Sequence, residues 1–441
     1  MSLRNYPEYK DTHIEWVGKV PAHWSLLPLK LVADYVNGYA FKPDTWKAEG
    51  TPIIRIENLN GGENFNYSQD SVDARHHVYR GDLLFSWSGN RGTSFGPFLW
   101  GRDGVHYLNQ HIFKIVNFDC HKKWFYWALK AVTAYVESQA SGIIGMVHIT
   151  KSDLGAIKIP TPCIQEQETI ASFLDKEIAK IDVLIGEQEK LLTLLAEKRQ
   201  ATISHAVTHG LNPNVSMKDS GIAWLGAVPV HWSVEPLARR YNVQLGKMLD
   251  SAKITGANLR RYLRVYDVQW GGVNTEDLPL MDFDADARAK FRLVPGDLLV
   301  NEGGSYPGRA AIWSGALDEC YYQKALHRLR SYSADLDTSQ FFFYVLFWAA
   351  HRGVFVYGGN ETTIEHLPAE RLRRYRFAFP PLEEQLQIAT FLNAETIKLD
   401  ALKTEAEHAI DLLGDRRSAL ISAAVTGKID VRNAVPHELA A

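Results

Sequence analysis

Two long proline-free stretches of the chain place apolar residues mostly three or four positions apart. In the first stretch, which includes 172–206, these residues are Ile170, Leu174, Ile178, Ile181, Ile185, Leu192 and Leu195. In the second they are Ile388, Leu392, Leu399, Leu402, Ile410, Leu413 and Leu420. This spacing predicts amphipathic helices with a narrow apolar stripe close to a heptad seam. The prolines that bound the stretches are start and stop signals: Pro160, Pro162, Pro213, Pro380, Pro381 and Pro436.

The two helical stretches are copies of each other. Residues 166–208 align without a gap with residues 384–426, 218 positions later, with 21 identities in 43 positions. A second repeat lies upstream, where residues 10–29 match residues 218–237 at 12 of 20 positions. The tetrapeptide Gly-Asp-Leu-Leu recurs between these repeats, at 81–84 and 296–299. The chain is therefore a tandem duplication.

Each predicted helix of about 40 residues would be roughly 60 Å long. A helix with one apolar stripe needs a partner in water, and the simplest partner is its own duplicate. We therefore expect the two helices to pair antiparallel as a spacer between two domains. The alternative, that each helix packs only on its own domain, stays open at this point.

The segments between the repeats differ from each other and predict short strands mixed with helices. The expected strands are 53–56, 81–85, 263–265 and 296–300, and the expected aromatic-rich helices are 122–139 and 339–356. The fold class is thus α+β, with two α+β domains in a tandem pseudo-two-fold repeat, separated by two long antiparallel helices in a coiled coil. The predicted boundaries are 1–160 for domain 1, 161–212 for the central helical spacer, 213–379 for domain 2 and 380–441 for the C-terminal helical spacer.

The repeated phrase that opens each half contains Val-Pro-x-His-Trp. We expect it to cross the base of each domain with tryptophans as buried anchors, because a large ring contributes much apolar area. The anchors are Trp16, Trp24, Trp224 and Trp232.

Composition narrows the function classes. Hydrophobic residues make up 46% and charged residues 22% of the 441 residues, which is typical of globular protein. The three cysteines are single and far apart, which favours a reducing cytoplasm over a disulfide framework. No signal peptide is visible and no apolar run is long enough for a bilayer, so no membrane partner is expected. The net charge of -3 does not by itself indicate nucleic-acid binding. An electrostatic argument for such binding therefore depends on local patches of basic residues or on a basic partner.

The divergent segments are rich in side chains that bind base edges or phosphate, interleaved with aromatic residues. In the first half the candidates are Asn58, Asn60, Arg75, His76, His77, Ser86, Ser88, Asn90, Arg91, Gln110 and His111. In the second half they are Arg260, Arg261, Arg264, Gln269, Asn301, Ser305, Arg309, Gln323, Lys324, Arg373 and Arg374. The last two belong to a basic run, 371–376, which is either a phosphate contact or a solvated edge strand.

Motifs of cofactor chemistry are missing. The chain has neither a phosphate-binding GxxxxGK[ST] loop nor a GxGxxG fingerprint that opens a helix after a strand. His205 and His209 stand one helical turn apart, but no glutamate accompanies them and their duplicates are Ala423 and Gly427. We therefore predict no catalytic, cofactor-binding or metal-binding residues in this chain.

The duplicated helices closely resemble the helical regions of type I restriction-modification specificity subunits. The resemblance lies in Glu-Gln-x-x-Ile-Ala-x-Phe-Leu at 166–174 and 384–392, in Asp182 and Asp400, and in the segments 199–208 and 417–427. The Val-Pro-x-His-Trp openings are similar to the same family. One departure is Thr208-His209-Gly210, where the second copy has Thr426-Gly427-Lys428, and it concerns only a local turn.

The resemblance implies that each divergent domain recognises one half of a split sequence in double-stranded DNA, while the helices set the gap. It further implies two methyltransferase subunits, which carry S-adenosylmethionine and methylate adenine, together with restriction subunits. This chain would itself be non-catalytic.

Two other functions stay open from the residues alone: a self-contained nuclease with dispersed acidic residues, and a coiled-coil scaffold with two protein-binding heads.

Overall fold

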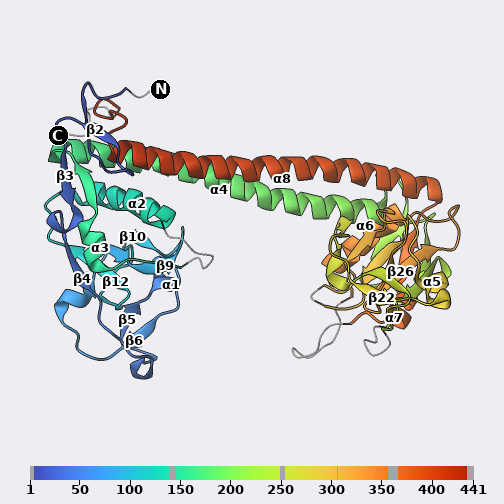
Figure 1. Ribbon diagram of the computed structural model, residues 1–441. Coiled ribbons are helices and arrows are strands. Elements are labelled where there is room, and N and C mark those ends of the chain that lie inside the picture. Colours follow the sequence, from blue (N-terminus) through green and yellow to red (C-terminus); the bar gives the residue numbers. More distant parts are fainter. Residues whose placement is uncertain (1–3, 140–145, 249–253, 305, 356–365, 435–441) are drawn as a thin grey trace. The chain divides into compact units, whose positions relative to one another are not determined.

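The computed structural model describes residues 4–139, 146–248, 254–304, 306–355 and 366–434 (Figure 1). The chain forms two compact units. Unit 1 is Met1–Glu189 with Glu407–Ala441, and unit 2 is Lys190–Ala406. Both units mix helices and strands, as the sequence predicted.

Unit 1 contains short strands and helices of its own, plus one end of each long helix. The strands are β1 (Tyr9–Asp11), β2 (Lys19–Pro21), β3 (Ser25–Pro28), β4 (Asp34–Asn37), β5 (Thr51–Ile54), β6 (Asn66–Ser68), β7 (His77–Val78), β8 (Leu83–Ser86), β9 (Ser88–Asn90), β10 (Gly96–Leu99), β11 (His106–Leu108), β12 (Ile112–Val116), β13 (Met146–His148) and β14 (Lys158–Thr161). The helices are α1 (Ile56–Leu59), α2 (Lys122–Gln139) and α3 (Lys151–Ala156).

Unit 2 is built in the same way. Its strands are β15 (Met217–Asp219), β16 (Ala227–Pro229), β17 (Ser233–Pro236), β18 (Tyr241–Leu245), β19 (Leu259–Leu263), β20 (Val268–Gln269), β21 (Gly272–Val273), β22 (Leu280–Asp282), β23 (Leu298–Asn301), β24 (Ala310–Ile312), β25 (Tyr321–Tyr322), β26 (Leu326–Ser331) and β27 (Arg376–Phe379). Its helices are α5 (Ala285–Phe291), α6 (Ser339–His351) and α7 (Ala369–Arg374).

The sheets of the two units follow one plan although their sequences differ. An antiparallel four-stranded sheet has the order β4-β12-β8-β10 in unit 1 and β18-β26-β23-β24 in unit 2. A second sheet contains one parallel pair, β5 with β11 in unit 1 and β19 with β25 in unit 2. An aromatic-rich helix packs on the first sheet, α2 through Trp124 and Phe125 and α6 through Phe341 and Phe342. The duplication therefore extends through the divergent segments, where the sequence shows little of it.

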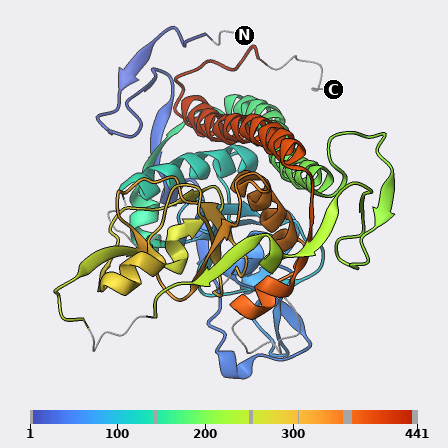
Figure 2. The same ribbon diagram turned by 90° about the vertical axis from the view of Figure 1, so that its right-hand side faces the viewer.

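The two predicted long helices are confirmed. They are α4 (Ile164–His209) and α8 (Leu382–Val425), which lie side by side in Figures 1 and 2. In unit 1, Arg417 Nε lies 3.0 Å from Asp182 Oδ1, and in unit 2 Arg199 forms an ion pair with Asp400. Arg417 and Asp400 are the duplicates of Arg199 and Asp182, so the same pair occurs once in each unit with the helices exchanged. This exchange requires antiparallel pairing.

Each long helix ends at a glycine in the left-handed region, Gly210 with φ +77° and Gly427 with φ +73°. A Cβ on Gly427 would lie 2.3 Å from Pro21 Cδ, and a Cβ on Gly210 would lie 2.8 Å from Glu384 Oε1. The backbone conformation favours glycine at both positions, and close packing against Pro21 also requires it at Gly427. At the sequence departure Thr208-His209-Gly210, α4 continues to His209 whereas α8 ends at Val425, and the left-handed glycine follows one alignment position later, at Gly210.

The repeated opening phrase anchors each unit to the start of a long helix. Trp24 and Trp232 are buried, and each indole Nε1 donates to a glutamate of the helix, Glu166 or Glu384, at 3.1 Å. Trp16 and Trp224 are only half-buried and lie against the aromatic-rich helix of their unit. The anchor prediction therefore holds fully for two of the four tryptophans.

Three local predictions were wrong. The strands expected at 53–56 and 263–265 end at Ile54 and Leu263, because the next residue starts a helical turn. The backbone N of Arg55 or Arg264 donates there to the side chain of Asn58 or Asp267 three residues later. Helix α6 ends at His351, because Gly353 takes φ +71°; Val356, the last residue of the predicted helix, lies outside the described residues. Of the two alternatives for the basic run 371–376, the structure does not form a single edge strand, because the run divides between α7 and β27, and the phosphate contact stays a prediction.

The four-segment domain division stays a prediction, because the boundary between the two compact units falls inside the long helices. Within the described ranges, no helix combines the length and apolar character that a membrane span requires.

We predict that Gly427→Ala destabilises unit 1 more than Gly18→Ala does. Gly18 has φ +72° with open space around it, so its replacement adds only backbone strain of about 1–2 kcal/mol. Gly427→Ala adds a clash with Pro21, for roughly 1–3 kcal/mol more. Denaturant unfolding of both variants measures the difference; equal losses would contradict the packing described for the helix end.

Candidate functional site

In each unit the two parallel strands end at the same edge of their sheet, the common edge. Polar loops follow the strands there. In unit 1, β5 and β11 end together, and Asn109 N donates to Ile54 O at 3.2 Å. In unit 2, β19 and β25 end together, and Gln323 N donates to Leu263 O at 3.1 Å. Neighbouring parallel strands bring their carboxyl ends to one edge, so residues far apart in sequence meet there.

In unit 1 this edge surrounds a cavity of about 440 Å³. Three predicted residues line it, Asn60, Asn90 and His111. Sequence reasoning missed the other polar residues of the lining: Arg55, Glu57, Thr93, Ser94 and Asn109. The sequence could have indicated two of them, because Asn109 precedes the candidate Gln110 and Arg55 lies three residues before the candidate Asn58.

Side chains around the cavity of unit 1 contact one another. The His111 ring lies 5.4 Å from the Trp87 ring, and Gln110 Nε2 lies 3.3 Å from His111 Nε2. Arg55 Nη1 contacts Glu57 Oε1 at 2.9 Å, which fixes the guanidinium at the rim. The arrangement presents amide and imidazole groups to a ligand, which is the chemistry that hydrogen-bonds to base edges.

In unit 2 the corresponding edge carries arginine, glutamine and lysine. Arg309 Nη1 donates to Gln269 Oε1 at 2.6 Å, and the half-buried Gln323 and exposed Lys324 follow β25. Lys324 stands where unit 1 has Gln110, because both follow the residue that bonds to the parallel partner strand. The two units thus present different chemistry at one structural position.

Several predicted residues support the fold and are not on the surface. Asn58, Ser86, Ser88, His76 and Asn301 are buried. Asn58 caps α1 and bonds to Gly62 O and Asn64 O, while His76 bonds to Asn37 O. Arg264 is bidentate to buried Asp267, which raises the pKa of the arginine through hydrogen bonding. These groups are used inside the fold and do not belong to the surface that would meet a ligand.

The remaining candidates lie elsewhere or outside the description. His77 begins β7, which lies on the side of β11 away from β5, and Arg75 lies in the helical turn just before it. Arg260 pairs with Glu319 at 3.0 Å, and Arg261 is exposed on β19. Of the others, Arg91 is exposed beside Asn90, Arg373 bonds to Val243 O, Arg374 is exposed on α7, and Ser305 lies outside the described residues.

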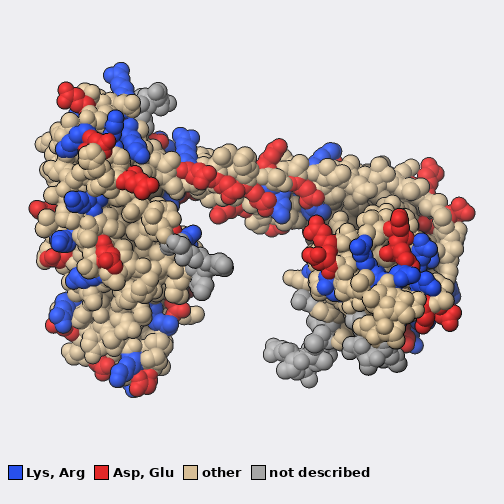
Figure 3. Space-filling model, viewed as in Figure 1, with Lys and Arg blue, Asp and Glu red and all other residues tan. Residues whose placement is uncertain are grey.

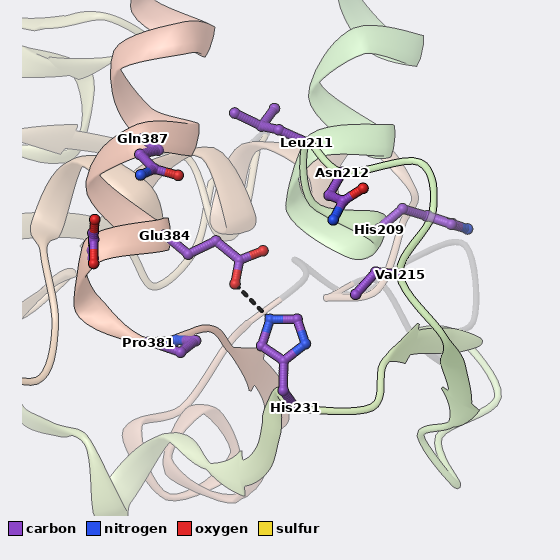
Figure 4. A pocket seen from close by; sticks show the side chains of 9 residues that line it. His209, Leu211, Asn212, Val215, His231, Pro381, Glu384 and Gln387 are labelled. Carbon is purple, nitrogen blue, oxygen red and sulfur yellow. Dashed lines mark hydrogen bonds and ion pairs between the residues drawn. The ribbon is translucent and has the colours of Figure 1, made fainter.

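A further cavity of about 530 Å³ lies in unit 2 between the start of α8 and the segment after α4 (Figure 4). His231 Nε2 contacts Glu384 Oε2 there at 2.7 Å. In unit 1 the equivalent glutamate, Glu166, is covered by Tyr6 and Arg432, with Arg432 Nε at 3.9 Å from Glu166 Oε1. His231, Glu384 and Gln387 of its lining belong to the duplicated segments, whereas Leu211, Asn212 and Val215 belong to the segment after α4.

Within the described ranges, no group of three His, Cys, Asp or Glu side chains could hold a metal ion. The rings of His205 and His209 stack at 5.1 Å. On the face drawn in Figure 3, Lys and Arg side chains lie among Asp and Glu side chains, in line with the net charge of -3.

The two units share one arrangement of strands and helices but present different polar surfaces. This is typical of a recognition protein with two binding domains. The profile described as the type I restriction modification DNA specificity domain matches residues 21–193 and 284–410, which is more than half of the chain. The chain belongs to this family. Its relatives are named specificity subunits, a non-catalytic class of subunit, and the chain carries two tandem DNA-recognition domains.

Individual relatives match over nearly the whole length. The chain is 23% identical over 434 residues to the EcoBI specificity subunit of Escherichia coli, covering 96% of this chain and 90% of that protein. It is 23% identical over 428 residues to the MjaVIII specificity subunit of Methanocaldococcus jannaschii, covering 94% and 95%. The resemblance inferred from the repeated helices is thereby confirmed, and the family decides against the nuclease and scaffold alternatives.

Solved structures agree on the fold. A chain from a structure of complex assembly and conformational transition of the type I R-M system has a TM-score of 0.64 at 16% identity, covering 92% of this chain and 98% of that chain. The HsdS subunit from Thermoanaerobacter tengcongensis has a TM-score of 0.51 at 15% identity, covering 93% and 98%.

We predict that unit 2 loses stability in mild acid through His327. This residue is fully buried on β26, its Nε2 bonds to Leu367 O, and burial lowers its pKa to about 4. The folded pKa lies below the unfolded value of about 6.5, so the unfolded chain binds the proton first as pH falls. Stability should therefore decrease from pH 6.5 toward pH 4, by up to about 1.4 kcal/mol per pH unit.

Unfolding free energies of the native protein and of His327→Gln between pH 4.5 and 7.5 check this. Glutamine keeps a donor for Leu367 O but does not titrate, so its profile should be flatter. Parallel profiles would show that another group causes the acid sensitivity.

Proposed function

We propose that each unit reads one half of a bipartite DNA target and that the paired helices α4 and α8 fix the length of the unread gap. The observation that supports this proposal is that the two units share their strand order and helix contacts but differ in their exposed polar residues. The strand order, the Trp–Glu contact and the Asp–Arg helix pair occur in both units. The polar groups at the common edge differ, which is what two unlike half-sites require.

The proposed DNA contacts are the exposed or half-buried polar residues at and around that edge. At the edge they are Arg55, Asn60, Asn90, Gln110 and His111 in unit 1 and Gln269, Arg309, Gln323 and Lys324 in unit 2. The exposed arginines away from the edge, Arg91, Arg261 and Arg374, are proposed as phosphate contacts. Amide groups suit adenine, and arginine and lysine suit guanine or phosphate.

The proposed partners follow from the family. They are double-stranded DNA, two methyltransferase subunits that dock on the helices, and restriction subunits, all in the cytoplasm. No cofactor is assigned to this chain: S-adenosylmethionine would bind to the methyltransferase subunits, into which the target adenine would be flipped. A net charge of -3 is compatible with this assembly, because the partners can supply many of the phosphate contacts.

The first test changes unit 1 alone. Replacing Asn60, Asn90 and His111 together with alanine should relax or abolish one half-site while the other half-site and the gap stay the same. The measurement is genome-wide mapping of methylated bases in a host that supplies the partner subunits. Arg80→Ala, which removes an exposed ion pair with Asp103, is the control and should leave the motif unchanged. A triple variant that alters both half-sites would contradict the assignment of one half-site per unit.

The second test shortens both helices in register. Deleting residues 187–193 from α4 and the antiparallel partner segment 406–412 from α8 removes two helical turns, about 10 Å. The tolerated gap should shorten by roughly three base pairs at 3.4 Å per pair, with both half-sites unchanged. A control keeps the length and replaces the exposed residues of the same segments with other polar residues. An unaltered gap in an active deletion variant would reject the spacer role.

A further inference from the structure

We propose that Arg309 reads a guanine in the half-site of unit 2, with its guanidinium oriented by Gln269 and Tyr306. This inference rests on the proposed function, because it names one base contact within one half-site. It assigns a base preference to one position, whereas the family assignment gives only that unit 2 recognises DNA.

The guanidinium of Arg309 is held in a defined orientation. Its Nη1 donates to Gln269 Oε1 at 2.6 Å, and its Cζ lies 4.1 Å from the centroid of the Tyr306 ring. The amide of Gln269 is itself fixed, because Nε2 donates to Tyr266 O at 2.7 Å. This contact turns the oxygen of Gln269 toward the arginine. A fork that is already oriented loses less side-chain entropy when a base binds.

The partners of Arg309 are neutral, which separates it from the structural arginines of unit 2. Arg240, Arg264 and Arg330 each form an ion pair with a buried aspartate. Among the described residues, no carboxylate pairs with Arg309. Gln269 uses one of the five guanidinium donors, so the fork keeps its charge and further donors for a ligand.

The surroundings place this group at the surface of the common edge. The Tyr306 side chain is 59% exposed, and Gln269 is exposed on β20. Arg309 is half-buried, and its Nε is buried without a hydrogen-bond partner. The donors left for a ligand are therefore those of Nη1 and Nη2. Guanine offers two acceptors, O6 and N7, at the spacing of the arginine fork.

The duplicate position in unit 1 cannot hold an arginine. Arg309 O accepts from Asn301 N, and the residue paired with the matching Ser86 of unit 1 is Gly96. A Cβ on Gly96 would lie 2.7 Å from Thr133 Oγ1, and its φ of +114° disfavours any side chain. The contact is therefore specific to the half-site that unit 2 reads.

The test compares methylation motifs in a host with the partner subunits. In the native protein, the unit 2 half-site should contain a guanine. Arg309→Ala should relax that position, with discrimination against other bases falling roughly 5- to 150-fold. Arg309→Lys keeps the charge but not the fork or the Gln269 geometry, so it should lose most of the discrimination while retaining affinity. Gln269→Ala should cause a smaller loss at the same base, as expected of a positioning residue.

Arg261→Ala is the matched control, because Arg261 is an exposed arginine of the same unit on β19. It should lower methylation of all sites alike without changing the motif. Thermal unfolding of each variant excludes a folding defect.

Three results would overturn the proposal: a unit 2 half-site without guanine, an unchanged motif in active Arg309→Ala, or equal weakening at all sequences, which is typical of a phosphate contact. Absence of any bipartite motif in the native protein would instead refute the proposed function.

Discussion

The structure depends on one carboxylate in the first turn of each long helix, the buried Glu166 in α4 and the half-buried Glu384 in α8. Glu166 is 6% exposed and accepts hydrogen bonds from the Trp24 indole and the His23 ring. Glu384 makes the same contacts with Trp232 and His231. A carboxylate is favoured at a helix N-terminus, and charge-assisted hydrogen bonds to it contribute about 1.5–3 kcal/mol each. This interaction joins the opening phrase of a unit to its long helix, 142 residues apart in unit 1.

Each unit is completed by the far end of the other copy's helix. Ile421, Ala424 and Val425 of α8 belong to the core of unit 1, and Ile203, Ala206 and Val207 of α4 belong to the core of unit 2. The last turns of the helices end at glycines that fit against the opening phrase or its glutamate partner. Because both helices contribute residues to the core of each unit, the helix termini are constrained like the domain cores, which accounts for the sequence similarity of the repeats at the ends.

This frame leaves the polar edge of each unit free to differ. The edge is formed by residues that follow strands, and the backbones of Asn109 and Gln323 make the same hydrogen bond in the two units. The side chains of the exposed residues that come next, Gln110 and Lys324, are available for ligand contact and can change without loss of the sheet. The buried Asn58 and the half-buried Arg264 lie in the same loops but maintain the helical turns that shape the edge. Neighbouring residues of one loop thus have different roles: some are available to contact a ligand, and others maintain the shape of the loop.

The sequence by itself determined the duplication, both long helices and the α+β class, because repeats and helical periodicity are local properties of the chain. It also identified Asn60, Asn90, His111, Gln269 and Arg309 as polar residues suited to DNA. It could not separate them from Asn58, Ser86 and Asn301, since burial depends on how distant strands pair. Only the tertiary structure decided which polar residues meet at one edge, because β5 and β11, like β19 and β25, are joined by hydrogen bonds between segments roughly fifty residues or more apart.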